Sequence, residues 1–158
     1  GVISRDPSVK STKSERDLEF LTKQQKELIL HAFDSVKPKG GKLCYCTCSV
    51  LVEENEAVVD YLLNHREGAK CIEPPFDPRF DATLRKGITR YGKHIFNPQV
   101  QNSRRIYPHD LNMDGFFLAL IDVLPHEAQS TNDNQFTRKG KRTFTKKLGG
   151  YNKKWFIL

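Results

Sequence analysis

The chain has 158 residues, 28% of them charged, and a formal net charge of +7, so its length suits one domain with a single core. No apolar run approaches the roughly 18 residues of a membrane helix, and the first residues do not resemble a signal peptide, which argues against a membrane or secreted protein. The excess of positive charge favours a polyanionic partner, although a basic, solvated surface accounts for it equally well.

The N-terminal third predicts a surface connection followed by a helix. Residues 1–20 mix Ser, Thr, Pro and charges of both signs without a helical or strand period. From Leu21 onward, apolar residues recur at steps of three and four, which predicts a helix over Thr22 to Val36. Pro38 and the glycine pair at 40–41 would end it.

The next segments alternate between strand and helix. The run KLCYCTCSV, residues 42–50, predicts a buried strand of a parallel sheet, and residues 52–68 predict a helix with Glu53, Glu54 and Glu56 in its first turn. A short strand is expected at 70–73. This alternation is typical of an open α/β sheet, where ligands bind beyond the carboxyl ends of the strands.

The remaining chain divides into three parts. Residues 74–105, rich in Pro, Gly, Arg and aromatics, predict loops and short hairpin strands, whereas GFFLALIDVL at 115–124 predicts an inner strand. Beyond Pro125 the composition becomes strongly basic with interleaved aromatics. We therefore expect one domain over 1–124 and a basic extension over 125–158, either flexible or in contact with RNA.

Cys48 is the candidate nucleophile because it lies where a strand ends and a helix begins, where a thiol is displayed at the sheet rim. On position alone, a structural thiol is equally compatible with the pattern. Cys44 and Cys46 are expected to act as small apolar filler within the strand. Zinc knuckles use two to four intervening residues, and the interval here is one, so we expect no metal.

A second set of candidates lies near the last predicted strand. Arg104, Arg105 and His109 are of residue types that contact RNA phosphates, although a solvated basic turn has the same composition. Asp114 and Gly115 would shape a base pocket through their turn. The two phenylalanines that follow are more typical of a core.

Three segments resemble the Nol/Nop/Sun family of RNA cytosine-5 methyltransferases. KLCYCTCSVLVEENEAVVDYLL resembles its strand leading into Thr-Cys-Ser and a Glu-Asn-Glu helix, and RRIYPHDLNMDGFFLALI resembles the signature near the end of its catalytic domain. GVISRDPSVK with QQKELILHAFDSV is similar to the segment that joins the family's two cysteine motifs. The resemblance covers residues 1–124 and is strongest to the eukaryotic nucleolar branch that modifies large-subunit ribosomal RNA.

The resemblance implies a fold, a reaction and a setting. The fold is the C-terminal half of a Rossmann-like, S-adenosylmethionine-dependent methyltransferase sheet. The reaction is methylation of cytosine carbon 5 through a covalent adduct with Cys48, flanked by Thr47 and Ser49. The partner is RNA, namely pre-rRNA or large-subunit rRNA, and the setting is a reducing one, the nucleus and nucleolus.

The family's glycine-rich cofactor loop and its second cysteine, in an Asp-Ala-Pro-Cys-Ser-Gly motif, precede a segment like GVISRDPSVK, and neither occurs in these 158 residues. We therefore expect the cofactor-binding half to be absent and the chain alone to be inactive and to self-associate through an open sheet edge. The alternative is a non-catalytic RNA-binding or ribosome-assembly module of the same fold. That motif upstream of Gly1 would favour the enzyme.

Overall fold

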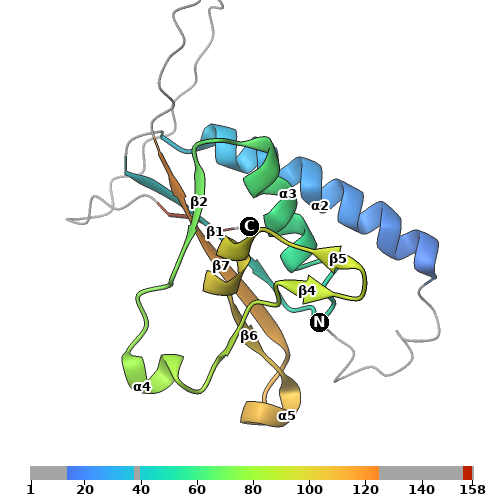
Figure 1. Ribbon diagram of the computed structural model, residues 1–158, viewed down its shortest axis with the longest axis vertical. Coiled ribbons are helices and arrows are strands. Elements are labelled where there is room, and N and C mark those ends of the chain that lie inside the picture. The colour runs from blue at the N-terminus through green and yellow to red at the C-terminus, as the bar shows by residue number, and fades with distance from the viewer. Residues whose placement is uncertain (1–13, 38–39, 125–154, 158) are drawn as a thin grey trace, which may run out of the picture.

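The computed structural model describes residues 14–37 and 40–124, together with the backbone of residues 155–157. Helices α2 (Glu15–Ser35) and α3 (Glu56–His65) lie on one face of a sheet (Figure 1). The main strands of that sheet are β1 (Gly41–Thr47), β2 (Ala69–Ile72), β6 (Arg104–Ile106) and β7 (Phe116–Val123). The expected α/β class is confirmed.

Helix α2 begins at Glu15, well before the predicted start at Thr22. The reason is a capping box: the Ser14 hydroxyl accepts a hydrogen bond from the Asp17 amide at 3.2 Å, and Asp17 Oδ2 accepts one from the Ser14 amide at 2.9 Å. These bonds satisfy backbone groups that the first helical turn would leave unpaired. The polar composition of residues 15–20 therefore belongs to a helix, and the prediction of a surface connection is wrong there.

Strand β7 is the inner strand of the sheet, as predicted for this apolar run. On one side β7 pairs antiparallel with the whole of β1, from Gly41↔Val123 to Thr47↔Phe117. On the other side it pairs antiparallel first with β2 and then with β6. Because β1 and β2 both run antiparallel to β7, they run parallel to each other, with α3 as the crossover between them.

The prediction that β1 is a fully buried strand of a parallel sheet is wrong in two respects. Its pairing with β7 is antiparallel, since β7 is inserted between the two parallel strands. Its burial alternates: Leu43 and Tyr45 are buried in the core, whereas Cys44 and Cys46 are half-buried on the opposite face. A strand with one less covered face takes this alternating pattern.

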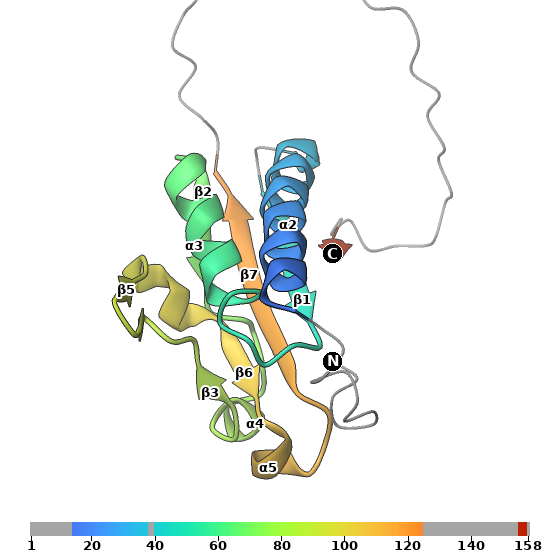
Figure 2. The same cartoon turned by 90° about the vertical axis from the view of Figure 1, so that its right-hand side faces the viewer.

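The hydrophobic core lies between the two helices and the sheet. Figure 2 shows α2 and α3 side by side over that sheet face, with β7 passing behind them. Ile29 from α2, Leu62 from α3, Leu43 from β1, and Phe117 and Ile121 from β7 are all fully buried there. Full burial of each such side chain contributes about 1.5–3 kcal/mol, so this layer dominates the stability of the described part.

The segment between β2 and β7 consists of loops and short elements, as predicted. They are α4 (Pro78–Asp81), β3 (Arg85–Lys86), β4 (Arg90–Tyr91), β5 (His94–Ile95), the 3-10 helix η2 (Pro98–Asn102) and α5 (Pro108–Leu111). Strands β4 and β5 form a small antiparallel hairpin of their own. Figure 1 shows α4 and α5 projecting at the end of the sheet away from the start of β1.

The predicted basic extension lies almost wholly outside the described residues. Its one described element is the backbone of β8 (Trp155–Ile157), which pairs parallel with Lys42–Cys44 on the free side of β1. None of the helices in the described part of the chain combines the length and hydropathy that a membrane span requires.

Candidate active site at the end of strand β1

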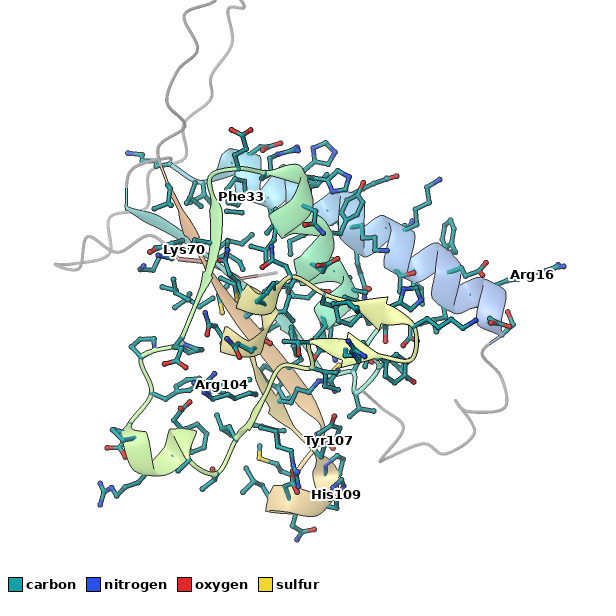
Figure 3. The ribbon with its side chains drawn as sticks, in the orientation of Figure 1. Arg16, Phe33, Lys70, Arg104, Tyr107 and His109 are labelled. Carbon is teal, nitrogen blue, oxygen red and sulfur yellow. The ribbon has the colours of Figure 1, made fainter. Side chains whose placement is uncertain are left out.

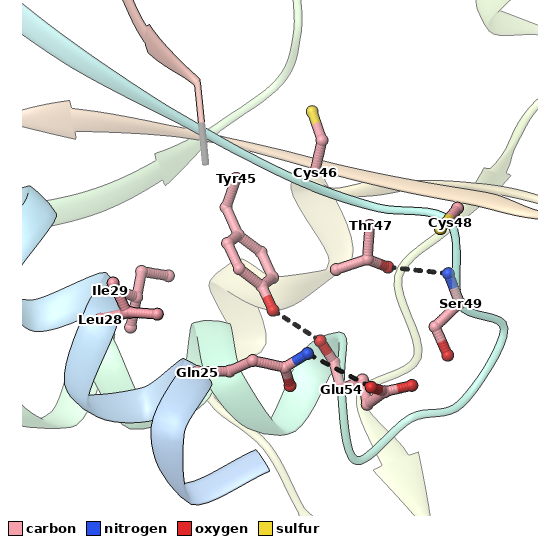
Figure 4. A pocket seen from close by; sticks show the side chains of 9 residues that line it. All are labelled: Gln25, Leu28, Ile29, Tyr45, Cys46, Thr47, Cys48, Ser49 and Glu54. Atoms are coloured by element: carbon pink, nitrogen blue, oxygen red, sulfur yellow. Dashed lines mark hydrogen bonds between the residues drawn. The ribbon is translucent and has the colours of Figure 1, made fainter. Parts of the chain in front are cut away.

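Cys48 follows directly after β1, and its side chain is exposed. It lines a cavity of about 330 Å³ between the end of β1 and helix α2, whose walls include Gln25, Leu28, Thr47 and Ser49 (Figure 4). Small-molecule sites usually measure roughly 300–1,000 Å³, so this cavity is at the small end of that range. The position matches the predicted one, at the rim of the sheet where a strand ends.

The turn that closes this cavity is held against the strand and the helix. The Tyr45 hydroxyl donates to the backbone carbonyl of Glu54 at 2.7 Å, and Gln25 Nε2 donates to Glu54 Oε1 at 3.2 Å (Figure 4). Burial raises the pKa of the Tyr45 hydroxyl, so it remains a donor at neutral pH. Residues 48–55, named here the Cys48 loop, are therefore anchored at their far end.

Asn55 connects the two residues that flank Cys48. Thr47 Oγ1 donates to Asn55 Oδ1 at 2.5 Å, and Asn55 Nδ2 donates to the carbonyl oxygen of Ser49 at 2.9 Å. The Ser49 amide in turn donates to Thr47 Oγ1 at 3.2 Å. Asn55 is fully buried, so these bonds are shielded from water.

Arg105 supports the Cys48 loop from β6. Its guanidinium forms a bidentate ion pair with Glu56, and Nη1 donates to the carbonyl oxygen of Val50 at 2.9 Å and to the Tyr107 hydroxyl at 3.2 Å. Arg105 and Glu56 are 2% and 0% exposed. Burial alone would lower the pKa of Arg105, but Glu56 raises it, so the guanidinium stays charged.

Arg104 is also directed inward, toward α4. Its Nε and Nη2 donate to the two carboxylate oxygens of Asp81 at 2.6 and 3.0 Å, and Nη2 donates to Glu73 at 3.3 Å. The side chain is 3% exposed. The donors of Arg104 and Arg105 are thus occupied by protein acceptors, and this geometry favours the support of neighbouring loops over contact with phosphate.

His109 is the exposed member of the predicted RNA-contact group. Its side chain is 74% exposed and stacks on the Tyr107 ring at 5.5 Å between centroids, at the tip formed by α5 (Figure 3). Arg85 donates to both oxygens of Asp110 beside it, at 2.6 and 2.7 Å, and this lowers the pKa of Asp110. The tip therefore combines an imidazole, a phenol and a guanidinium.

Gly115 brings this tip close to the Cys48 loop. A Cβ at this buried glycine would lie 2.5 Å from Val50 Cγ1 and 3.6 Å from Pro108 Cδ, so a larger residue would push the two segments apart. Asp114 is half-buried next to it. The structure thus places Gly115 and Cys48 on adjoining segments, whereas the sequence places them far apart.

The other three cysteines differ from Cys48 in exposure. The sulfurs of Cys44 and Cys46 lie 3.5 Å apart, and the hydrogen bond between them lowers the pKa of Cys44 and raises that of Cys46. Burial raises the pKa of Cys71 to about 12. Residues 14–37 and 40–124 contain no group of three or more His, Cys, Asp or Glu side chains placed to hold a metal ion.

The supporting residues Asn55, Glu56 and Arg105 were not predicted as a set. An asparagine directly before an apolar helix predicts only a cap. The pairing of a glutamate and an arginine 49 residues apart follows from the return of β6 to the sheet.

The fold defines the class of the protein as a methyltransferase-type α/β protein. A solved structure described as a methyltransferase homolog from Pyrococcus horikoshii superposes with a TM-score of 0.60 at 28% identity, over 71% of this chain and 34% of that one. NSun6 from the same organism gives a TM-score of 0.52 at 25% identity, over 72% and 25%.

The family model described as 16S rRNA methyltransferase RsmB/F matches residues 1–122, and the chain belongs to this family. Mouse 28S rRNA (cytosine-C(5))-methyltransferase is 48% identical over 122 residues, which are 75% of this chain and 15% of the relative. The 25S rRNA (cytosine-C(5))-methyltransferase nop2 of Schizosaccharomyces pombe is 40% identical over 135 residues, 84% and 21%. The resemblance to RNA cytosine-5 methyltransferases is confirmed, and the chain spans about a fifth or less of these relatives.

Proposed function

We propose that the protein containing this chain methylates carbon 5 of cytosine in large-subunit ribosomal RNA, with Cys48 as the nucleophile. The observation that carries the proposal is an exposed, free thiol at the carboxyl end of β1, with both neighbouring residues hydrogen-bonded to one buried side chain. Relatives named as 28S and 25S rRNA cytosine-C5 methyltransferases, at 40–48% identity, support the choice of substrate.

The role of Cys48 follows from the chemistry of cytosine. Carbon 5 of the ring is a poor nucleophile until a thiolate adds to carbon 6, forms a carbon–sulfur bond and moves an electron pair onto carbon 5. After carbon 5 has been methylated, a base removes its proton and the carbon–sulfur electron pair returns to sulfur. The Cys48 thiolate is thus regenerated, and the product is released.

S-adenosylmethionine would supply the electrophilic methyl group. The described residues do not fit this cofactor: glycines 41, 68, 87 and 115 pack against protein atoms, and the two with open space beside them, Gly40 and Gly92, lie in separate turns and not in one glycine-rich loop. We therefore place the cofactor site, and the base that takes the carbon 5 proton, in other parts of the protein. On this proposal the chain alone is inactive and self-associates.

The tip around α5 is the proposed RNA-contacting surface. His109 is exposed on it, Tyr107 and Arg85 lie beside His109, and Gly115 keeps the tip against the Cys48 loop. Stacking rings and cations near a nucleophile suit a single-stranded nucleotide taken out of its stack. Asp114 would shape the same surface, and Arg104 and Arg105 would hold it in place from behind. A nucleolar location follows from this choice of RNA.

Methyl transfer by the full-length protein tests the proposal. The Cys48→Ala variant should bind RNA normally but lose methyl transfer to cytosine by at least about 1,000-fold, because the covalent route is closed. The control is Cys44→Ser, which lies within β1 and does not line the cavity around Cys48, and it should retain the activity. Methyl transfer by Cys48→Ala at the native rate would refute the assignment. RNA binding without any methyl transfer by the native protein would favour a ribosome-assembly module instead.

A further inference from the structure

We infer that Asn55 is a positioning residue for the reaction: its carboxamide ties the Thr47 side chain, before Cys48, to the Ser49 backbone, after it, and so presents the thiol to carbon 6 of the base. The inference rests on the proposed role of Cys48 and adds to it a residue that never touches the substrate.

The first observation is that one side chain joins the residue before Cys48 to the residue after it. Asn55 Oδ1 accepts from the Thr47 hydroxyl at 2.5 Å, and Asn55 Nδ2 donates to the Ser49 carbonyl at 2.9 Å. Thr47 Oγ1 closes the ring by accepting from the Ser49 amide at 3.2 Å. Cys48 lies between Thr47 and Ser49 in the chain, and its own side chain is exposed.

The second observation is that Asn55 does not do what its position in the helix predicts. It is the N-cap residue of α3, yet its side chain makes no capping hydrogen bond. An asparagine cap that bonds to the helix amides typically stabilises its helix, and this contribution is forgone here. The carboxamide is turned back toward the Cys48 loop, where it is fully buried. A broken local rule of this kind is typical of a functional site.

The hydrogen bonds among Thr47, Ser49 and residue 55 require an amide side chain at position 55. The acceptor and the donor must sit on one planar group, because Thr47 offers a hydroxyl proton and Ser49 offers a carbonyl oxygen. An ionised aspartate has the same shape but only acceptors, so it would face the Ser49 carbonyl with no proton to donate. The Cys48 loop would then turn away, and the sulfur would move relative to the base.

A displaced Cys48 sulfur should slow the chemical step specifically. Displacement of a reacting atom by about 1 Å can lower a rate about 100-fold while the substrate still binds, because binding uses other contacts. Substitutions that break these hydrogen bonds should therefore lower kcat and leave KM nearly unchanged. A general loss of stability would instead lower the fraction of folded enzyme and leave both constants of the folded fraction intact.

Four variants of the full-length protein test the inference, measured by kcat, KM and the rate of covalent adduct formation with RNA containing 5-fluorocytosine. Asn55→Asp and Thr47→Val should each lower kcat and the adduct rate by about 10- to 100-fold, with KM within about threefold. Thr47→Ser keeps the hydroxyl and should stay within about threefold of the native rate.

The matched control is Asn102→Asp, which removes another amide-to-carbonyl bond, from Asn102 Nδ2 to the Cys71 carbonyl at 2.9 Å, far along the chain from Cys48. It should keep the native adduct rate whatever its melting temperature. Native rates in both Asn55→Asp and Thr47→Val, or an equal loss in Asn102→Asp, would overturn the inference. A native protein that forms no adduct through Cys48 would instead refute the proposed function on which the inference rests.

Discussion

The guanidinium of Arg105 binds both carboxylate oxygens of Glu56 and, through its third nitrogen, the carbonyl oxygen of Val50 at 2.9 Å. One buried ion pair thereby connects β6 with the first residue of α3 and with the Cys48 loop. Glu56 also accepts from the Ile88 amide at 3.0 Å, so its charge is well satisfied. This buried pair therefore supports the loop that carries Cys48.

Loss of one partner of this pair should be costly. We predict that Arg105→Leu destabilises the protein by about 3–5 kcal/mol, because it leaves the Glu56 carboxylate buried without a counter-charge. Urea unfolding measures the difference. Arg66→Leu is the control, because Arg66 pairs with Asp34 in the same bidentate way, at 2.7 and 2.8 Å, but on the protein surface. Loss of this exposed pair should lower the free energy of unfolding by only about 0–1 kcal/mol. Equal losses in both variants would contradict the buried role.

The contact between Gly115 and Val50 should be sensitive to a single methyl group. Gly115→Ala places a Cβ 2.5 Å from Val50 Cγ1, and the stiff valine must move with its loop. We expect methyl transfer to fall about 10-fold or more, because the loop carries the nucleophile. Val50→Ala in the same molecule should restore much of the activity by making room. A double variant as impaired as the single one would show that the contact does not matter.

The ion pair between Asp81 and Arg104 gives a pH dependence with a defined sign. Hydrogen bonds from Arg104 lower the pKa of Asp81, so the folded state favours the ionised carboxyl. The stabilisation by this ion pair is fully present above the ordinary carboxyl pKa of about 4. It is lost as the pH falls through the lowered pKa that Asp81 has in the folded state. The stability gap between the native protein and Asp81→Asn should therefore close in acid. A gap that stays constant from pH 7 to pH 2 would contradict this.

The four free thiols should react in order of exposure. Iodoacetamide on the folded protein should label Cys48 first, since its side chain is exposed, and Cys71 last, since it is fully buried with a pKa raised to about 12. Mass spectrometry of peptides from a time course measures the order. In urea all four should react at similar rates. Labelling of Cys71 as early as Cys48 in the folded state would contradict the described packing.

The fold was largely predictable where burial sets a period. The apolar positions of α3 and of β7 follow their helix and strand patterns, and the structure contains both elements. The antiparallel direction of β7 was not predictable, because a run such as GFFLALIDVL shows that it is buried but not which way it enters the sheet. The start of α2 was missed because its first turn is polar and its signal is one Ser14–Asp17 box.

The position of Cys48 in the fold was predictable, but the residues that support its loop were not. That Cys48 follows the end of a strand is a property of local sequence, whereas its role as the nucleophile stays a prediction. Asn55 and Arg105 act through contacts that exist only after β6 has returned beside β7. Arg105 was predicted to contact RNA on its charge alone, and its 2% exposure could not be read from the sequence.

The most direct measurement is the mass of the covalent adduct between the full-length protein and RNA carrying 5-fluorocytosine in place of cytosine. The fluorine at carbon 5 prevents the proton loss that would release the thiol, so the adduct accumulates. Trypsin should place it in the peptide spanning residues 43–66, which holds three of the four cysteines, and fragment ions should assign it to Cys48. An adduct on Cys44 or Cys46, or none under conditions in which the native protein methylates RNA, would contradict the account.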